Sequence, residues 1–478
     1  MIANHILFIY DDTIIKTEFD SLKDALIFKY PKESSDEFFM FLGQLVGMLS
    51  FTQSLAQSVP SSLKLENMKF TIMQKSHYLL FLGFRDLDQP ESYLKKKLQM
   101  FVDIFTFYNG SFDRLRQSCQ SKEDFLSKLD LLCTSYIQFT QCFFNTVTSI
   151  FYSIPRITFN KVTSIIFLKA ARLLEACQKE NGIECGCVLS EGRMIYSQIP
   201  YELTHHLLLL YQQKCHSPRV FYPGIELPFG VSIRCIYVTI EQYNRIVSSS
   251  LMNSYKNNNE GTESFSNTSA DHYSCDTVEN SVVNFSSDIA NCHESKISKD
   301  EPSNLIQDDT IALHLYVQNY SNTIILLFMN AQVIYGKKEI TKLWELSLPC
   351  LKDIEAQLKS LVSPQKLQNA RDKYESHLSY QKIGLCKNNL KKMDNEEELI
   401  NTINTIHQQF KSSPGTTDIF LRNHRFTVFG KQTETEEVFY QPNIKQRSTG
   451  ELQIGADMTW LFDLYSNDRQ SLKKSSKN

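Results

Sequence analysis

The chain has 478 residues, which is longer than one compact core accommodates and predicts about two to four domains. Apolar residues make up 42% of it and aromatic residues 12%, so the composition excludes a largely disordered chain. Lysine and arginine number 50 against 53 aspartate and glutamate, and the net charge of -3 excludes nucleic-acid binding through bulk positive charge.

Residues 1–155 predict a first domain in which a small antiparallel sheet carries helices on its faces. Short apolar runs of strand length predict strands at residues 5–11, 26–30, 63–66, 69–74 and 78–84. Helical spacing of apolar residues predicts helices at residues 36–56, 90–107 and 122–151. The first helix begins with Asp36 and Glu37, which suit the positive end of the helix dipole.

The helix at residues 36–56 is apolar on more sides than one sheet requires. Its main stripe has four members at helical spacing, namely Phe38, Leu42, Leu45 and Leu49. Three further apolar residues lie partly outside that stripe, namely Phe39, Val46 and Phe51. The helix therefore has more apolar surface than it needs to cover its own sheet.

Gly43 and Gly47 form a Gly-x-x-x-Gly pair on the same helix, a spacing that lets another backbone approach closely. One interpretation is close packing of the helix on the sheet of its own domain. The other is a partner surface, because an exposed apolar helix face usually marks an interface. The candidate interface predicted from this helix has four members: Phe39, Gly43, Val46 and Gly47.

The rest of the chain predicts two more domains separated by a linker. Residues 156–247 predict a second domain with helices near 164–178 and 201–213 and strands at 185–190, 194–198 and 232–239. Residues 248–308 are rich in serine and asparagine, cannot offset their chain entropy by burial, and are predicted to be a disordered linker. Residues 309–466 predict a third domain with strands at 311–317, 323–329, 416–422 and 425–430 and helices near 340–362 and 396–410. The polar tail at residues 467–478 is predicted to be disordered.

No motif in the sequence identifies a metal or catalytic site. Cys185 and Cys187 are the one close thiol pair, and they lack further ligands at zinc-finger spacing, so buried strand thiols are expected. His205 and His206 are neighbours on a helix and point about 100° apart, so they cannot chelate one ion together. They are expected to be polar residues at a surface or an edge.

Signals for nucleotides and membranes are also missing from the sequence. Gly336-Lys337 and Gly430-Lys431 lack the upstream glycine and the following hydroxyl residue of a phosphate loop. Lys95-Lys96-Lys97 is interpreted as a solvated helix face, with contact to an acidic partner or anionic lipid as the alternative. We see no signal peptide and no apolar run of about 18 residues, so a soluble cytosolic protein with reduced thiols is expected. No cofactor, metal or catalytic residue is expected.

Several segments, taken in chain order, resemble one known family. They are residues 8–11, 28–31, 42–47, 80–83, 105–110, 168–178 and 186–189, followed more weakly by 427–442. The most specific of them is Leu168–Gln178. With these segments the chain resembles the Hermansky–Pudlak syndrome 4 protein family, and the predicted linker falls where that family has a long variable insert.

This resemblance implies a mixed α/β (α+β) fold of three longin-like domains, each a small antiparallel sheet flanked by helices. It implies an obligate partner, the Hermansky–Pudlak syndrome 1 protein, in the biogenesis of lysosome-related organelles complex 3. It also implies that the pair is a guanine nucleotide exchange factor for Rab GTPases of the thirty-two/thirty-eight subfamily, with a role in melanosome or pigment-granule formation. The implied location is the cytoplasm, with peripheral association to endosomal, lysosomal or lysosome-related organelle membranes.

Two alternatives stand beside this prediction. The chain also resembles the Ccz-type subunit of a late-endosomal Rab exchange factor. A longin-type trafficking adaptor or tether without exchange activity would have the same sequence features. An enzyme is disfavoured, because the sequence offers no acid, base or metal motif for catalysis. Nucleotide exchange requires no such group from the protein, so this absence agrees with an exchange factor.

Overall fold

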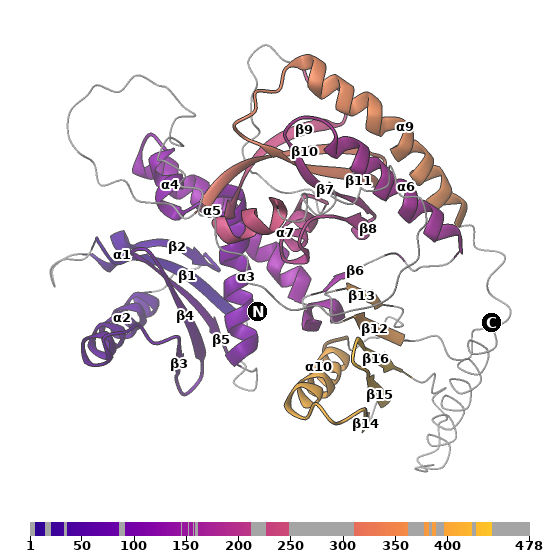
Figure 1. Ribbon diagram of the computed structural model, residues 1–478. Coiled ribbons are helices and arrows are strands. Elements are labelled where there is room, and N and C mark those ends of the chain that lie inside the picture. The colour runs from indigo at the N-terminus through magenta and orange to yellow at the C-terminus, as the bar shows by residue number, and fades with distance from the viewer. Residues whose placement is uncertain are drawn as a thin grey trace, which may run out of the picture.

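The structure is a computed structural model in which three β-sheets are flanked by helices (Figure 1). It describes residues 5–14, 21–32, 36–85, 91–144, 146–151, 153–155, 157, 161–211, 226–247, 310–361, 377–381, 385–388, 396–422 and 427–441. The predicted linker at 248–308 and the predicted tail at 467–478 therefore lie outside the described residues. The mixed α/β class predicted from the sequence is confirmed.

The first sheet is antiparallel, with the strand order β2-β1-β5-β4-β3. Its strands are β1 (His5–Asp11), β2 (Leu26–Tyr30), β3 (Ser62–Lys64), β4 (Lys69–Lys75) and β5 (Tyr78–Phe84). Side chains alternate between the two faces of a strand, so Phe8 and Tyr10 pack against helix α2 (Asp36–Ala56). Leu7 and Ile9 point to the other face, where they join a second core. A short helix, α1 (Leu22–Ala25), precedes β2.

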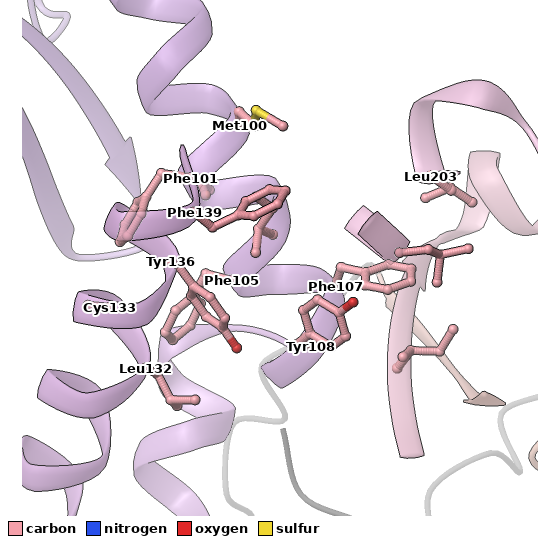
Figure 2. Close-up of a cluster of buried hydrophobic side chains, with 14 of the residues drawn as sticks. Met100, Phe101, Phe105, Phe107, Tyr108, Leu132, Cys133, Tyr136, Phe139 and Leu203 are labelled. Atoms are coloured by element: carbon pink, nitrogen blue, oxygen red, sulfur yellow. The ribbon is translucent and has the colours of Figure 1, made fainter. Parts of the chain in front are cut away.

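A layer of helices lies between the first sheet and the second. Its members are α3 (Glu91–Asn109), α4 (Phe112–Gln117), α5 (Lys122–Phe144) and α7 (Tyr201–Tyr211). One continuous core cluster joins this layer to both sheets. Figure 2 shows Phe105 beside Tyr136 of α5, and Phe107 on the side of Leu203 of α7. The Phe107 ring also lies 6.3 Å from that of Phe328 in the second sheet, so α3 ties the two sheets together.

The second sheet has the order β8-β7-β11-β10-β9. Its strands are β7 (Ile183–Ser190), β8 (Arg193–Ser197), β9 (Val231–Thr239), β10 (Thr310–Tyr320) and β11 (Thr323–Asn330). Helices α6 (Lys161–Gln178) and α9 (Lys337–Leu361) cover its outer face. The two helices are bridged by the ion pairs of Lys169 with Asp353 and of Glu180 with Lys342.

The sheets do not follow the predicted domain boundaries at residues 247 and 309. Strand β10 pairs with β9, and β11 pairs with β7, so one sheet contains strands from both sides of the predicted linker. Closing a long loop costs little more than closing a short one, which allows complementary strands to pair across it. The first two strands assigned to the third domain therefore belong to the second sheet.

The third unit consists of the third sheet and helix α10 (Glu396–Ser412), with a core of its own. The sheet order is β14-β15-β16-β12-β13-β6. Its strands are β6 (Ile154–Pro155), β12 (His377–Gln381), β13 (Leu385–Asn388), β14 (Asp418–Arg422), β15 (Thr427–Gln432) and β16 (Glu436–Tyr440). Five strands come from the C-terminal part, and β6 joins β13 in parallel from far upstream. The sequence predicted β14 and β15 but not the other four.

Several local predictions also need correction. The helix predicted at residues 122–151 ends at Phe144, and a 3-10 helix, η1 (Val147–Phe151), follows it. His205 and His206 are 5% and 7% exposed, so they are core residues and not the surface or edge residues expected. The imidazoles are buried because the helix that carries them is enclosed by the shared core, with Phe107 5.2 Å from His206. Burial and the neighbouring His205 lower the pKa of His206 to about 3.

Candidate functional site

Helix α2 packs only one of its sides on the first sheet. Leu42, Leu45 and Leu49 are buried there, at 0%, 0% and 3% exposure. They recur at three- and four-residue intervals, which places them on one side of an α-helix. From Phe38 to Ala56 the helix contains no charged residue, so its opposite side has no ionic group to hold water.

The opposite side of α2 presents large apolar side chains to solvent. The most exposed are Met40 at 69%, Met48 at 40%, Phe51 at 67% and Leu55 at 71%. They follow helical spacing along about 22 Å of the helix, at 1.5 Å per residue. We call these four residues, together with Gly47, the outer face of α2. Exposed apolar side chains gathered on one side of a helix, here with Gln44 between Met40 and Met48, usually mark an interaction site.

The predicted glycine pair is divided between two environments. A Cβ atom placed on Gly43 would lie 3.0 Å from Leu22 Cδ1, so this glycine serves close packing against α1 within its own unit. A Cβ atom placed on Gly47 would meet nothing within 4 Å, so this glycine opens outward. The two glycines therefore do not form one contact surface, and only Gly47 belongs to the outer face.

The two predicted apolar residues, Phe39 and Val46, are partly buried and pack on the core under α2. The Phe39 ring lies 5.7 Å from that of Phe38 and carries the Lys23 ammonium 5.0 Å above it. Lys29 lies 3.8 Å from the centre of the Phe38 ring. These residues form a basic and aromatic flank beside the N-terminal end of the outer face.

The sequence prediction named residues of this helix but did not select most of its exposed apolar residues. Met40, Met48 and Leu55 were not selected, and Phe51 was noted only as lying outside the main stripe. The signal was available: once Leu42, Leu45 and Leu49 define the buried side, residues 40, 48, 51 and 55 follow on the other side. What the sequence did not provide was the exposure of these side chains, which no second layer of the described residues covers.

Helix α2 is also long and apolar enough to cross a membrane, judged by its length and composition at Glu37–Ala56. This corrects the expectation that no run of the chain reaches such a length. Three of its leucines are buried against the first sheet, which makes the helix part of that domain's fold in this structure.

The other candidates have structural explanations. Cys185 and Cys187 are buried in β7, and burial raises the pKa of both thiols, which disfavours the reactive thiolate. Lys97 is only 8% exposed, so the Lys95–Lys97 run is not wholly a solvated face. Burial lowers the pKa of Lys97 to about 8, and its ammonium lies 4.8 Å from the centre of the Phe84 ring. Among the described residues, no group of three or more metal-ligating side chains could hold an ion.

A polar cluster at one end of the first sheet fixes α4 in place. The Asp11 carboxylate is 1% exposed and accepts hydrogen bonds from the Thr13 backbone N–H at 3.0 Å and from its hydroxyl at 2.6 Å. Arg116 Nη1 of α4 lies 3.3 Å from the same carboxylate. His77 Nε2 lies 3.5 Å from Asp113 Oδ1. The cluster thus satisfies a buried carboxylate and serves the fold.

Comparisons with known proteins agree with this architecture. Residues 4–110, which include the first sheet, α2 and α3, match the first longin domain of INTU, CCZ1 and HPS4. The chain is 27% identical over 203 residues to the BLOC-3 complex member HPS4 of Mus musculus. That match covers 42% of this chain and 29% of the mouse protein, so it spans less than a third of the relative's length.

The fold and the domain match together define the class, a longin-domain protein of the type shared by INTU, CCZ1 and HPS4. Within that class the comparisons support the resemblance to the HPS4 family that the sequence segments predicted.

Proposed function

We propose that this protein is one subunit of a heterodimeric guanine nucleotide exchange factor that activates Rab GTPases of the thirty-two/thirty-eight subfamily. The mouse relative is described as a member of the BLOC-3 complex, which supports a role in a multi-subunit assembly. The proposed partner is a protein of the Hermansky–Pudlak syndrome 1 type. The proposed place of action is the cytoplasmic surface of endosomes, lysosomes or lysosome-related organelles, reached through the complex.

The observation that carries the proposal is the outer face of α2 on the longin sheet. Each large apolar side chain moved from water into an interface contributes about 1.5–3 kcal/mol. Met40, Phe51 and Leu55 are each at least two-thirds exposed in the isolated chain, so they have most of that contribution still to make. A second subunit that covers them would be strongly favoured.

The charge of this surface supports a protein partner over a lipid surface. Helices that lie on membranes carry lysine or arginine beside their apolar side, where these residues meet anionic headgroups. The outer face of α2 has no charged residue from Phe38 to Ala56. The nearby ammonium groups of Lys23 and Lys29 lie over the Phe39 and Phe38 rings, at one end of the helix.

Nucleotide exchange on such a platform follows from binding energy alone. If the complex binds the nucleotide-free GTPase more tightly than the loaded one, linkage requires that it weakens nucleotide binding by the same factor. Displacing a switch loop that holds Mg²⁺ and phosphate is sufficient for this. The protein then contributes contact surface and no reacting group.

The test is release of a fluorescent GDP from candidate Rabs by the chain, its partner subunit and the two together. We expect acceleration only with both subunits present. Replacing Phe51 and Leu55 by aspartate should abolish complex formation and acceleration together. The control is Phe229→Asp, which changes a 95% exposed phenylalanine far from α2 and should leave both unchanged.

The outcomes separate the candidate functions. Partner binding without any acceleration, on any Rab tested, would refute exchange activity and favour an adaptor. Acceleration restricted to a late-endosomal Rab would favour the function of the CCZ1 branch of the same domain family. Normal assembly by the aspartate variant would show that the outer face of α2 is not the partner surface.

A further inference from the structure

The segment between α5 and α6 passes through three parts of the molecule within a few residues. We call η1, β6 and Ile157 the strap. At its start the Ser149 hydroxyl donates a hydrogen bond to the Phe144 carbonyl oxygen at 3.2 Å, which ties the strap to the end of α5. Ser149 is 1% exposed, so this attachment is buried.

At its middle the strap enters the core of the third unit. The Phe151 ring stacks on Tyr380 of β12 at 4.5 Å, and meets His407 of α10 edge-on at 4.8 Å. It also lies 5.4 Å from the Phe439 ring of β16. His407 Nδ1 is hydrogen-bonded to Glu437 at 2.7 Å, so the ring below Phe151 is held in a fixed orientation. Phe151 thus fills an aromatic slot built by three different elements.

At its end the strap returns to the other two sheets. Ile154 is 0% exposed and belongs to the core shared by the first and second sheets, while its backbone pairs with Leu385 of β13. The Ile157 backbone N–H then donates to the Met194 carbonyl oxygen of β8 at 3.2 Å. The third sheet is therefore completed by a strand that the rest of the molecule also holds.

The third unit is otherwise a body with a separate core. Its buried residues form their own cluster, to which Ile150 and Phe151 of the strap contribute. The strap thus belongs to both bodies, because Ile154 lies in the core shared by the first and second sheets.

We infer that the strap is a latch through which the third unit is docked, and that withdrawal of Phe151 releases this unit as one folded body. Local openings of this kind occur in cooperative segments with free energies below that of global unfolding. Release uncovers the aromatic slot of Tyr380, His407 and Phe439 and the edge of β13. The inference does not depend on the proposed exchange function.

Hydrogen exchange on the full chain tests the latch. Phe151→Ala should accelerate amide exchange in β13 on the order of tenfold or more, with Ile157, β15 and β16 still protected. The matched control is Phe410→Ala, which removes a 1% exposed phenylalanine from the same core, where its ring lies 6.4 Å from that of Phe439. It should accelerate exchange in α10 and β15 and leave β13 protected.

Two results would overturn the inference. If Phe151→Ala accelerated β15 and β16 as much as β13, the third unit would unfold and not undock. If β13 kept its protection, the strap would not control docking. Should the alanine variant fail to fold, Phe151→Leu keeps an apolar side chain in the slot but loses the ring stacking. It should show the same selective acceleration to a smaller degree.

Discussion

Substitution of Gly47 offers a sharp test, because the structure separates its effect on folding from its effect on binding. A Cβ atom at Gly47 meets nothing within 4 Å, whereas one at Gly43 would lie 3.0 Å from Leu22 Cδ1. Both residues occupy the interior of α2. The pair therefore differs in surroundings and matches in secondary structure.

The effect on folding follows from helix propensity. Replacing a helical glycine by alanine gains about 0.8–1.0 kcal/mol where the methyl group meets no obstacle. We expect Gly47→Ala to raise the free energy of unfolding by that amount. Gly43→Ala should gain less, because Leu22 must shift to admit the methyl group. Even Gly47→Leu should fold normally in the isolated chain.

The effect on binding has the opposite sign. A leucine at Gly47 projects from the outer face of α2, where a packed partner would have to accommodate it. Overpacking of this kind costs about 1–3 kcal/mol, which corresponds to roughly 5- to 150-fold weaker binding. The control is Gly415→Leu, because a Cβ atom at Gly415 also meets nothing within 4 Å and lies in the third unit.

Circular dichroism during thermal unfolding measures the effect on folding. Surface plasmon resonance with the partner subunit measures the effect on binding. The reasoning is refuted if Gly47→Leu lowers the melting temperature, since the residue would then be packed against its own domain. It is equally refuted if Gly47→Leu binds the partner with normal affinity. That result would remove this part of α2 from the interface.

Two further predictions concern the linker and the shared core. Deleting residues 248–304 should leave partner binding and exchange nearly unchanged, because each doubling of loop length costs only about 0.6 kcal/mol and β9 already pairs with β10 at Thr239 and Thr310. Loss of the folded second sheet, seen by circular dichroism, would contradict this. The pKa of His206 is lowered to about 3 by burial, so below its unfolded value of about 6.5 the unfolded state binds a proton that the folded state does not. Through this group, the free energy of unfolding should therefore fall by about 2 kcal/mol between pH 7 and pH 5. Urea unfolding of His206→Gln should show a pH dependence that is smaller by this amount. Identical pH dependence of stability in the variant and the parent protein would disprove the prediction.

Local pattern in the sequence was sufficient for many of the individual elements, although not for β6, β12, β13 and β16. The helix predicted at residues 36–56 has those limits in the structure, and the strand predicted at 78–84 does as well. Gly110, with a φ of +73°, follows the last residue of α3, close to the predicted end of that helix at residue 107, because glycine adopts this backbone conformation without steric cost. Apolar periodicity and turn residues are properties of neighbouring residues, so the sequence expresses them directly.

Only the tertiary structure decided which elements share a sheet. Strands β9 and β10 pair across the predicted linker, and β6 joins the third sheet from far upstream. These pairings depend on complementary faces that are distant along the chain, and no local pattern records them. The same holds for His206, which is buried because α7 lies between two sheets.

The exposure of α2 was settled in the same way. The sequence determined that the helix has more apolar surface than its own sheet can cover. The spacing of Gly43 and Gly47 left open whether this pair faces the helix's own sheet or a partner. The fold turns Gly43 toward Leu22 and Gly47 toward solvent, because the direction of each side chain depends on how the helix is rotated against the first sheet.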